Sequence, residues 1–241
     1  MITSRIGWFI ILPAIGVVLG GLLGARKRFP PLWQSAIQHF AAGVVFAAVA
    51  TEIMPDVLHG GSPSAALIGF AVGVALMFVL RAFAERLEAG EATTAYPLGL
   101  LMAVGIDCIV DGVVIGAGFA TGARQVLLIA VSLALEMFFL GLATSATIKG
   151  GGGRPLGIFG VCAGLGAILV LSAAAGLGLL SGQSSALLTG FLAFSAASLL
   201  YLVTEELLVR AHDIGETARV TALFFIGFLA VFAVELLSRP S

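Results

Sequence analysis

The chain has 241 residues, of which 60% are hydrophobic and only 10% are charged, and its mean hydropathy is +1.14. Because a soluble domain usually carries about a quarter charged residues, this chain has too little charge to cover a water-exposed surface. The net charge of −1 gives no sign of a nucleic-acid partner. We therefore expect an all-α integral membrane protein whose partner is the lipid bilayer.

Eight segments are apolar enough to cross a bilayer as helices, which takes about 20 residues each. In chain order they are 7–25, 35–58, 63–84, 97–120, 124–148, 155–180, 184–210 and 217–238. The breaks between them carry turn-forming residues, such as Gly60-Gly61-Ser62-Pro63. The first segment is long for a secretory signal and is followed by a basic cluster, so we interpret it as a true span. The sequence thus predicts a single transmembrane domain over 1–241.

The basic residues indicate how this bundle is oriented. Loops and helix ends on one side hold nine of the twelve, and the other side holds three: the nine are Arg26, Lys27, Arg28, Arg81, Arg86, Lys149, Arg154, Arg210 and Arg219, and the three are Arg5, Arg124 and Arg239. Lysine and arginine are enriched in cytoplasmic loops. We therefore expect a multi-pass protein of the cell (inner) membrane with both termini outside.

Two stretches of the sequence resemble each other. Residues 41–55 read AAGVVFAAVATEIMP and residues 195–209 read SAASLLYLVTEELLV, so that Val49 aligns with Val203 and Glu52 with Glu206. The stretches belong to the second and seventh segments, which cross the membrane in opposite directions. This pattern is typical of an inverted-topology repeat, in which a transport pathway lies at the interface between the halves.

Three acids fall in the middle of predicted spans. Asp107 and Asp111 are four residues apart and share one face of the fourth segment, and Glu136 lies at similar depth in the fifth. A charged carboxylate at a helix centre costs ~2.5–3.5 kcal/mol on insertion scales, and no lysine or arginine lies mid-span to neutralise these three. The acids either stay protonated or bind a cation, and we favour a cation-binding site.

Two sulfur-bearing neighbours are further candidate ligands. Cys108 follows Asp107 and Met137 follows Glu136, and a thiol or thioether would make the site softer. Cys108 points roughly 100° away from Asp107 around the helix, so it could also be a small packing residue.

Other polar residues mark a candidate pathway across the membrane. Glu52 and Asp56 lie in the outer half of the second segment, Glu206 lies toward the cytoplasmic end of the seventh, and His212 follows it. We expect all three histidines, His39 and His59 included, to be interfacial or solvated, with His212 able to receive a released ion.

Two motifs carry a resemblance to a known family. They are His39-Phe40-Ala41-Ala42-Gly43-Val44 leading to Glu52-Ile53-Met54-Pro55, and Ser198-Leu199-Leu200-Tyr201 leading to Glu205-Glu206-Leu207. With the eight spans and the acids of spans 4 and 5, the whole chain resembles the ZIP family of divalent-metal transporters. The resemblance implies eight transmembrane helices in a 3+2+3 inverted-repeat arrangement, both termini outside, and metal carboxylates on spans 4 and 5. It also implies that spans 1, 4, 5 and 6 move against spans 2, 3, 7 and 8.

The metal motif departs from the family pattern. Where the family has His-Asn-x-Pro-Glu-Gly in span 4, this chain has Asp107-Cys108-Ile109-Val110-Asp111-Gly112, and span 5 has Glu136-Met137-Phe138-Phe139-Leu140-Gly141. This substitution predicts a single, harder site in place of a binuclear one. Zinc, manganese, iron(II) and cobalt all remain compatible with such ligands as the substrate, and no organic cofactor is implied.

The leading hypothesis is a transporter, not an enzyme, that moves a divalent cation toward the cytoplasm. One alternative is a protein of the same fold with another substrate or with proton coupling, and another is a non-transporting metal sensor. An intramembrane aspartyl protease needs acids on facing helices, and the chain has neither a Tyr-Asp nor a Gly-x-Gly-Asp pattern. The small-residue face Gly69-x-x-x-Gly73 could serve a homodimer contact or internal packing.

Overall fold

A computed structural model describes residues 2–26, 29–88, 95–118, 123–179, 184–213 and 217–238. All regular structure in these ranges is helical. The helices are α1 (Ile2–Ala25), α2 (Pro31–Ala48), η1 (Val49–Ile53), α3 (Met54–His59), α4 (Pro63–Glu88), α5 (Leu98–Gly118), α6 (Ala123–Gly150), α7 (Pro155–Leu179), α8 (Ser185–Tyr201), η2 (Leu202–Leu207), α9 (Leu208–Asp213) and α10 (Ala218–Ser238).

Eight of the resulting rods are long and apolar enough to cross a membrane. They confirm the eight segments expected from the sequence. Six of the helix starts lie within one residue of the expected position, whereas α1 and α2 begin five and four residues earlier than expected. Pro31, Pro63 and Pro155 each occupy the first helical position, where the missing N–H costs no hydrogen bond. Lys27, Arg28, Arg239 and residues 119–122, which the sequence analysis used, lie outside the described ranges.

The second and seventh rods are each built from three helical pieces. A π-helical turn, η1 or η2, joins α2 to α3 and α8 to α9 without a break. In each turn a threonine hydroxyl donates to the carbonyl four residues back, from Thr51 to Ala47 and from Thr204 to Leu200, both at 2.9 Å. Pro55 has no N–H to return to the η1 carbonyls, which favours the extra residue there. The sequence analysis did not anticipate either turn.

These two rods correspond to each other along their length. The shift in numbering that aligns Glu52 with Glu206 also aligns Pro31 with Ser185 and His59 with Asp213, the first and last residues of the rods. Their two π-turns therefore occupy matching positions, although only one rod contains a proline near its turn. The inverted repeat itself stays a prediction.

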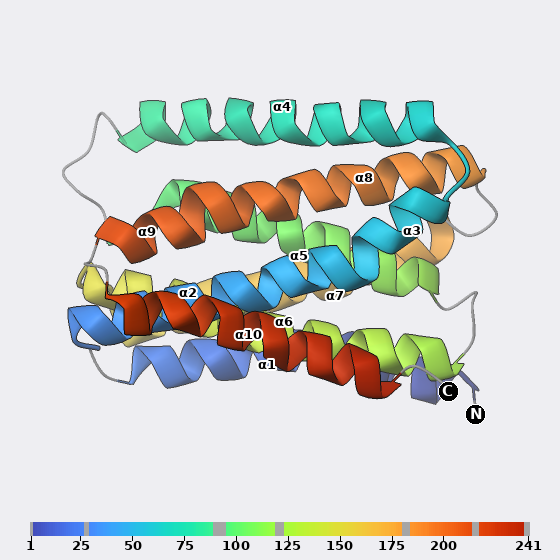
Figure 1. The fold of residues 1–241 in the computed structure, drawn as a ribbon. Helices are drawn as coiled ribbons and strands as arrows, with labels where there is room; N and C mark the ends of the chain where they lie inside the picture. The colour runs from blue at the N-terminus through green and yellow to red at the C-terminus, as the bar shows by residue number, and fades with distance from the viewer. Residues whose placement is uncertain are drawn as a thin grey trace.

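The rods pack as two groups (Figure 1). α1 packs most extensively against α6, and α5 against α7, with α1 also contacting α7. In the second group α10 packs along α2, and α4 packs along α8 at one outer edge of the bundle. The main contact between the groups runs between α2 and α6. We refer to α1, α5, α6 and α7 as the site layer, and to the α2–α3 rod, α4, the α8–α9 rod and α10 as the frame layer.

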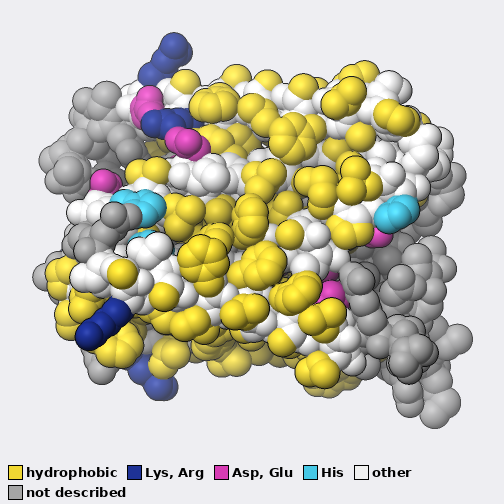
Figure 2. All heavy atoms as spheres, in the orientation of Figure 1, with side chains coloured by type: hydrophobic (Ala, Val, Ile, Leu, Met, Phe, Trp, Pro, Cys, Tyr) yellow, Lys and Arg dark blue, Asp and Glu magenta, His cyan; other side chains and the backbone are white. Residues whose placement is uncertain are grey.

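The outer surface is that of a membrane protein. One face is almost covered by hydrophobic side chains, and its described Lys and Arg side chains lie toward one end (Figure 2). Large apolar residues such as Leu67, Leu171 and Leu229 are well exposed on this surface, as lipid contact requires. Polar side chains are instead collected inside the bundle, where the site lies.

Candidate metal site

The three mid-span acids lie at the centres of two adjacent helices of the site layer. Asp107 and Asp111 stand near the middle of α5, and Glu136 stands midway along α6. Small residues hold these helices in place: carbonyl oxygens of Leu169 and Val17 lie where a side chain would stand on Gly112 and Gly141. The acids are therefore carried on tightly packed helices and not on loops.

The carboxylates converge on one point. One ligand atom from each of Asp107, Asp111 and Glu136 lies within 4.8 Å of the others, and their side chains are buried, with exposed fractions of 1%, 3% and 2%. Within the described part of the chain, both carboxylate oxygens of Asp107 and one oxygen each of Asp111 and Glu136 lack a hydrogen-bond partner. We call these three residues the acid triad. The expectation that Glu136 would meet the α5 acids is confirmed.

The triad is an unfavourable arrangement when its carboxylates are ionised and no cation is bound. Two unit charges at such a distance repel by roughly 3–4 kcal/mol at an effective dielectric constant of 20. The ion pairs formed among the described residues join Arg81 to Glu85 and Glu205, and Arg210 to Glu206, and leave the triad out. Carboxylate oxygens are ligands for hard divalent cations, so a bound ion would relieve both the repulsion and the lost hydration.

A fourth acid approaches from the frame layer. Glu52, in the π-turn η1, is half-buried and interacts electrostatically with Asp111 and Glu136. The sequence placed Glu52 on an outer pathway, and the structure brings it near enough to interact electrostatically with the triad, although it is not one of the three residues whose ligand atoms converge. π-turns often occur at functional sites because the extra residue changes the direction of a side chain.

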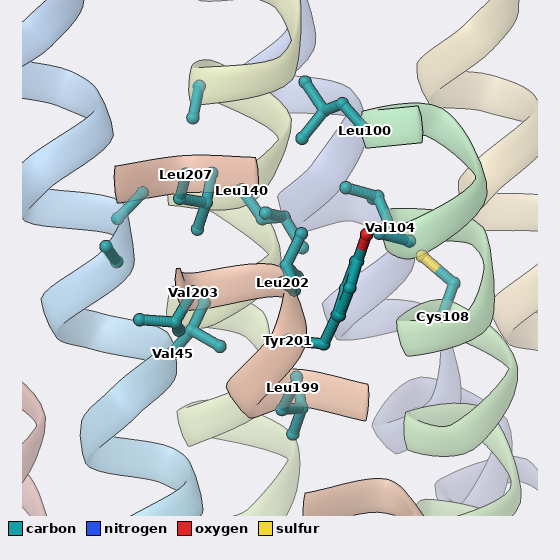
Figure 3. Packing of buried hydrophobic residues seen from close by; sticks show 14 of the residues in the cluster. Val45, Leu100, Val104, Cys108, Leu140, Leu199, Tyr201, Leu202, Val203 and Leu207 are labelled. Atoms are coloured by element: carbon teal, nitrogen blue, oxygen red, sulfur yellow. The ribbon is translucent and has the colours of Figure 1, made fainter. Parts of the chain in front are cut away.

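The two sulfur candidates lie beside the triad but pair with each other. Cys108 Sγ is 3.9 Å from Met137 Sδ, both side chains are fully buried, and Cys108 is not among the residues that converge with the acids. Both belong to the largest apolar cluster of the bundle. Figure 3 shows Cys108 pointing into this cluster on the side of Val104 and Tyr201. This placement favours the packing role for Cys108.

The remaining pathway candidates divide between the two ends of the bundle. Asp56 is exposed near the end of the α2–α3 rod, beyond Glu52. Glu206 is buried at the other end, where its carboxylate accepts a hydrogen bond from Arg210 Nη2 at 3.0 Å. His212 is exposed on α9, six residues farther along the chain.

One residue contradicts the sequence analysis. His39 was expected to be interfacial or solvated, but its side chain is only 1% exposed. It stands two turns inside α2, and the neighbouring α9 covers this part of the helix. The sequence held no signal for this, because the covering helix comes from a segment more than 160 positions away. His59, by contrast, is exposed as expected.

No protein-family model matches the chain, and a search of curated proteins also finds no match. The likeness to the ZIP family therefore stays a resemblance in two sequence motifs, and the geometry of the acid triad is the main indication of function.

Proposed function

We propose that this protein is a membrane transporter that moves a divalent metal cation toward the cytoplasm through the acid triad. The observation that carries the proposal is the triad itself: three buried carboxylates from two membrane-spanning helices, with ligand atoms within 4.8 Å of one another and with no ion pair to a described basic residue. Ionisable residues at this depth are costly and generally mark substrate or ion pathways. The metal is the substrate here, and no further cofactor is invoked.

The packing supports an inverted 3+2+3 repeat. In such a repeat, spans 1, 2 and 3 correspond to spans 6, 7 and 8, and span 4 corresponds to span 5. Each strong helix contact then has a counterpart. The contact of α1 with α6 matches that of α7 with α5, and the contact of α2 with α10 matches that of α8 with α4. Cys108 and Met137 occupy matching positions of spans 4 and 5, and they touch. Contact between equivalent positions is what a two-fold axis through the site requires, and repeat interfaces are where transporters bind substrate.

The two layers support a route for the ion. Glu52 of the frame layer interacts electrostatically with Asp111 and Glu136 of the site layer, from the end that carries the exposed Asp56. Glu206 and His212 lie on the frame layer toward the opposite end. Movement of the site layer along the frame would take an ion from the first pair toward the second.

The distribution of basic side chains supports the orientation. Arg26, Lys149 and Arg154 lie at or next to helix ends on the side where α9 stands, together with Arg210 and Arg219. By the preference of lysine and arginine for the cytoplasmic side, Glu206 and His212 face the cytoplasm and Glu52 faces outward. Both ends of the chain then lie outside the cell.

Ion binding is tested with the purified full-length protein by equilibrium dialysis against Zn²⁺, Mn²⁺, Fe²⁺ and Co²⁺. We expect one tightly bound ion per chain, lost in Asp111→Asn and in Glu136→Gln, because each variant keeps the size of the side chain and removes its charge. Glu85→Gln is the matched control, since Glu85 is an exposed acid outside the site. Unchanged binding in both triad variants would overturn the proposal.

The geometry of the triad also bears on the alternative that the protein is an intramembrane aspartyl protease. The triad does bring acids of facing helices together, so the objection that Asp107 and Asp111 share one helix no longer applies. The chain still lacks the sequence patterns of such enzymes, and a third acid in the cluster fits an ion better than a shared proton. Cleavage of an added membrane peptide that is lost in Asp111→Asn would favour the protease.

A further inference from the structure

His39 is the one buried imidazole of the described chain, and its hydrogen bonding leaves one nitrogen available. Its Nδ1 lies 2.9 Å from the Ser35 carbonyl oxygen. A carbonyl can only accept, so Nδ1 carries the proton and Nε2 of the neutral ring holds a lone pair. Nε2 is buried and has no hydrogen-bond partner among the described residues. An N–H fixed by a backbone carbonyl is also the usual arrangement behind a metal-bound histidine.

A second imidazole stands next to it. The rings of His39 and His212 have centroids 5.3 Å apart and are nearly perpendicular, at 89°. Their helices are held in register by Ser35, whose hydroxyl donates to the Ala211 carbonyl at 2.8 Å. Two imidazoles that share one tetrahedral ion, with metal–nitrogen distances of about 2.0–2.1 Å, have ring centres roughly 5 Å apart. The observed spacing is therefore already that of a two-histidine site.

The pair is accessible from one side only. His39 is buried while His212 is exposed, so an ion can exchange with solvent at His212 and be held from within by His39. On the same rod Arg210 pairs with Glu206 at 3.0 Å, so the positive charge of its guanidinium is balanced. Both histidines belong to the frame layer. Gln38, next to His39, donates to Thr147 of the site layer at 2.5 Å.

We propose that His39 and His212 form a second cation site, separate from the acid triad, that binds a borderline transition-metal ion through Nε2 of His39 and a ring nitrogen of His212. Imidazole favours zinc, copper, nickel and cobalt over the harder ions that carboxylates accept. Water would complete the coordination on the exposed side. A role for this site in releasing the transported ion to the cytoplasm rests on the proposed function, whereas metal binding by His39 and His212 does not.

The test uses Cu²⁺ as the probe and electron paramagnetic resonance as the readout, because coupling to imidazole nitrogen separates this site from the all-oxygen triad. The full-length protein is prepared without a histidine tag and given less than one equivalent of Cu²⁺. The wild type is expected to show two coupled imidazoles. His212→Ala and His39→Ala should each reduce the coupling to one ring or none and weaken Cu²⁺ binding at least tenfold.

His59→Ala is the matched control. His59 makes the same contact from Nδ1 to the carbonyl four residues back, at 2.7 Å from Pro55 O, but it is exposed and has no second imidazole among its described ring contacts. This variant should keep the wild-type spectrum. Should His39→Ala fail to fold, His212→Ala decides alone, since it changes an exposed side chain.

The outcomes separate this site from the transport proposal. Nitrogen coupling that persists in Asp111→Asn, and disappears in His212→Ala, supports a separate site whether or not the protein transports metal. A wild-type spectrum with oxygen ligands only, or nitrogen coupling unchanged in His212→Ala, would overturn the second site and leave the triad untouched.

Discussion

At the scale of single residues, the proposed metal site predicts that the acid triad couples stability to metal. The three carboxylates of Asp107, Asp111 and Glu136 repel one another when ionised, and a bound ion removes that cost. A ligand that binds only the folded state stabilises it by about 2.7 kcal/mol at a concentration 100 times its dissociation constant.

Asp111→Asn should therefore separate two effects. Without metal, the variant should be at least as heat-stable as the wild type in detergent, because one repelling charge is gone. With added metal, the wild type should gain several degrees in its unfolding temperature and the variant should gain almost none. Thermal unfolding followed by circular dichroism measures both, and a variant that keeps the full metal-dependent gain would contradict the role of Asp111.

Glu52 and Asp56 test whether acids outside the triad contribute to ion binding according to their distance from it. Because it interacts electrostatically with Asp111 and Glu136 and is half-buried, Glu52→Gln should weaken ion binding on the order of tenfold, which is about 1.4 kcal/mol. Asp56→Asn, at an exposed position, should have a much smaller effect. Titration calorimetry compares the two, and equal effects would mean that Glu52 contributes only a general surface charge.

The residue scale also shows where sequence reasoning succeeds and where it stops. Asp107 and Asp111 share a helix face and Glu136 sits at the same depth, so spacing alone predicted their convergence. Cys108 is next to the site in sequence, yet the geometry pairs it with Met137. His39 could not be predicted as buried, because its burial depends on α9, whose packing against α2 is a long-range contact.

At the scale of elements, close backbone approach explains much of the packing. A side chain added to Gly227 of α10 would meet the Phe40 carbonyl of α2, and one added to Gly73 of α4 would meet the Phe194 carbonyl of α8. The numbering shift that relates the two rods also relates these glycines and these phenylalanines. Without a strong hydrophobic driving force in lipid, such small-residue contacts hold helices together.

Gly227→Leu should consequently destabilise the bundle, by about 1–3 kcal/mol as is typical of overpacking, and Gly73→Leu should do the same. Gly178→Leu is the matched control on an apolar helix, because a side chain there meets open space. Thermal unfolding of the three variants in one detergent tests this. Equal unfolding temperatures for Gly227→Leu and Gly178→Leu would show that the α2–α10 contact is looser than described.

Helix limits were predictable from apolar length and, at Pro63 and Pro155, from prolines that mark helix starts, whereas α2 begins at Pro31, four residues before the predicted start. The π-turns η1 and η2 were not, since one extra residue in a turn leaves the apolar pattern almost unchanged. Their signal was present only indirectly, in the alignment of Glu52 with Glu206. Glu52 lies in η1 and Glu206 lies in η2, so the two aligned glutamates share the same local helix geometry.

At the scale of the whole molecule, the proposed orientation puts the α9 end of the bundle in the cytoplasm. Leu58 is exposed at the end of α3 and Asp213 is exposed at the end of α9, toward opposite ends of the bundle. The native cysteines, Cys108 and Cys162, are both buried. Labelling by a maleimide should therefore come mainly from cysteines introduced at the two ends.

In intact cells, Leu58→Cys should react with a membrane-impermeant maleimide, and Asp213→Cys should react only after the membrane is opened. This follows from the basic residues gathered at the α9 end. Labelling is read by the mass shift of the purified chain. The reverse pattern would mean that Glu206 and His212 face outward and that the direction of the proposed route is wrong.

The central claim is that the triad holds the ion that crosses the membrane, and ion flux into proteoliposomes tests it most directly. Wild type, Asp111→Asn and Glu85→Gln are reconstituted at equal density, and a metal-sensitive dye inside the vesicles records the initial rate for each divalent ion. We predict uptake of at least one ion by wild type and Glu85→Gln, and a loss of more than tenfold in Asp111→Asn. Uptake by Asp111→Asn at the wild-type rate, or folded wild type that moves none of the ions, would contradict the account.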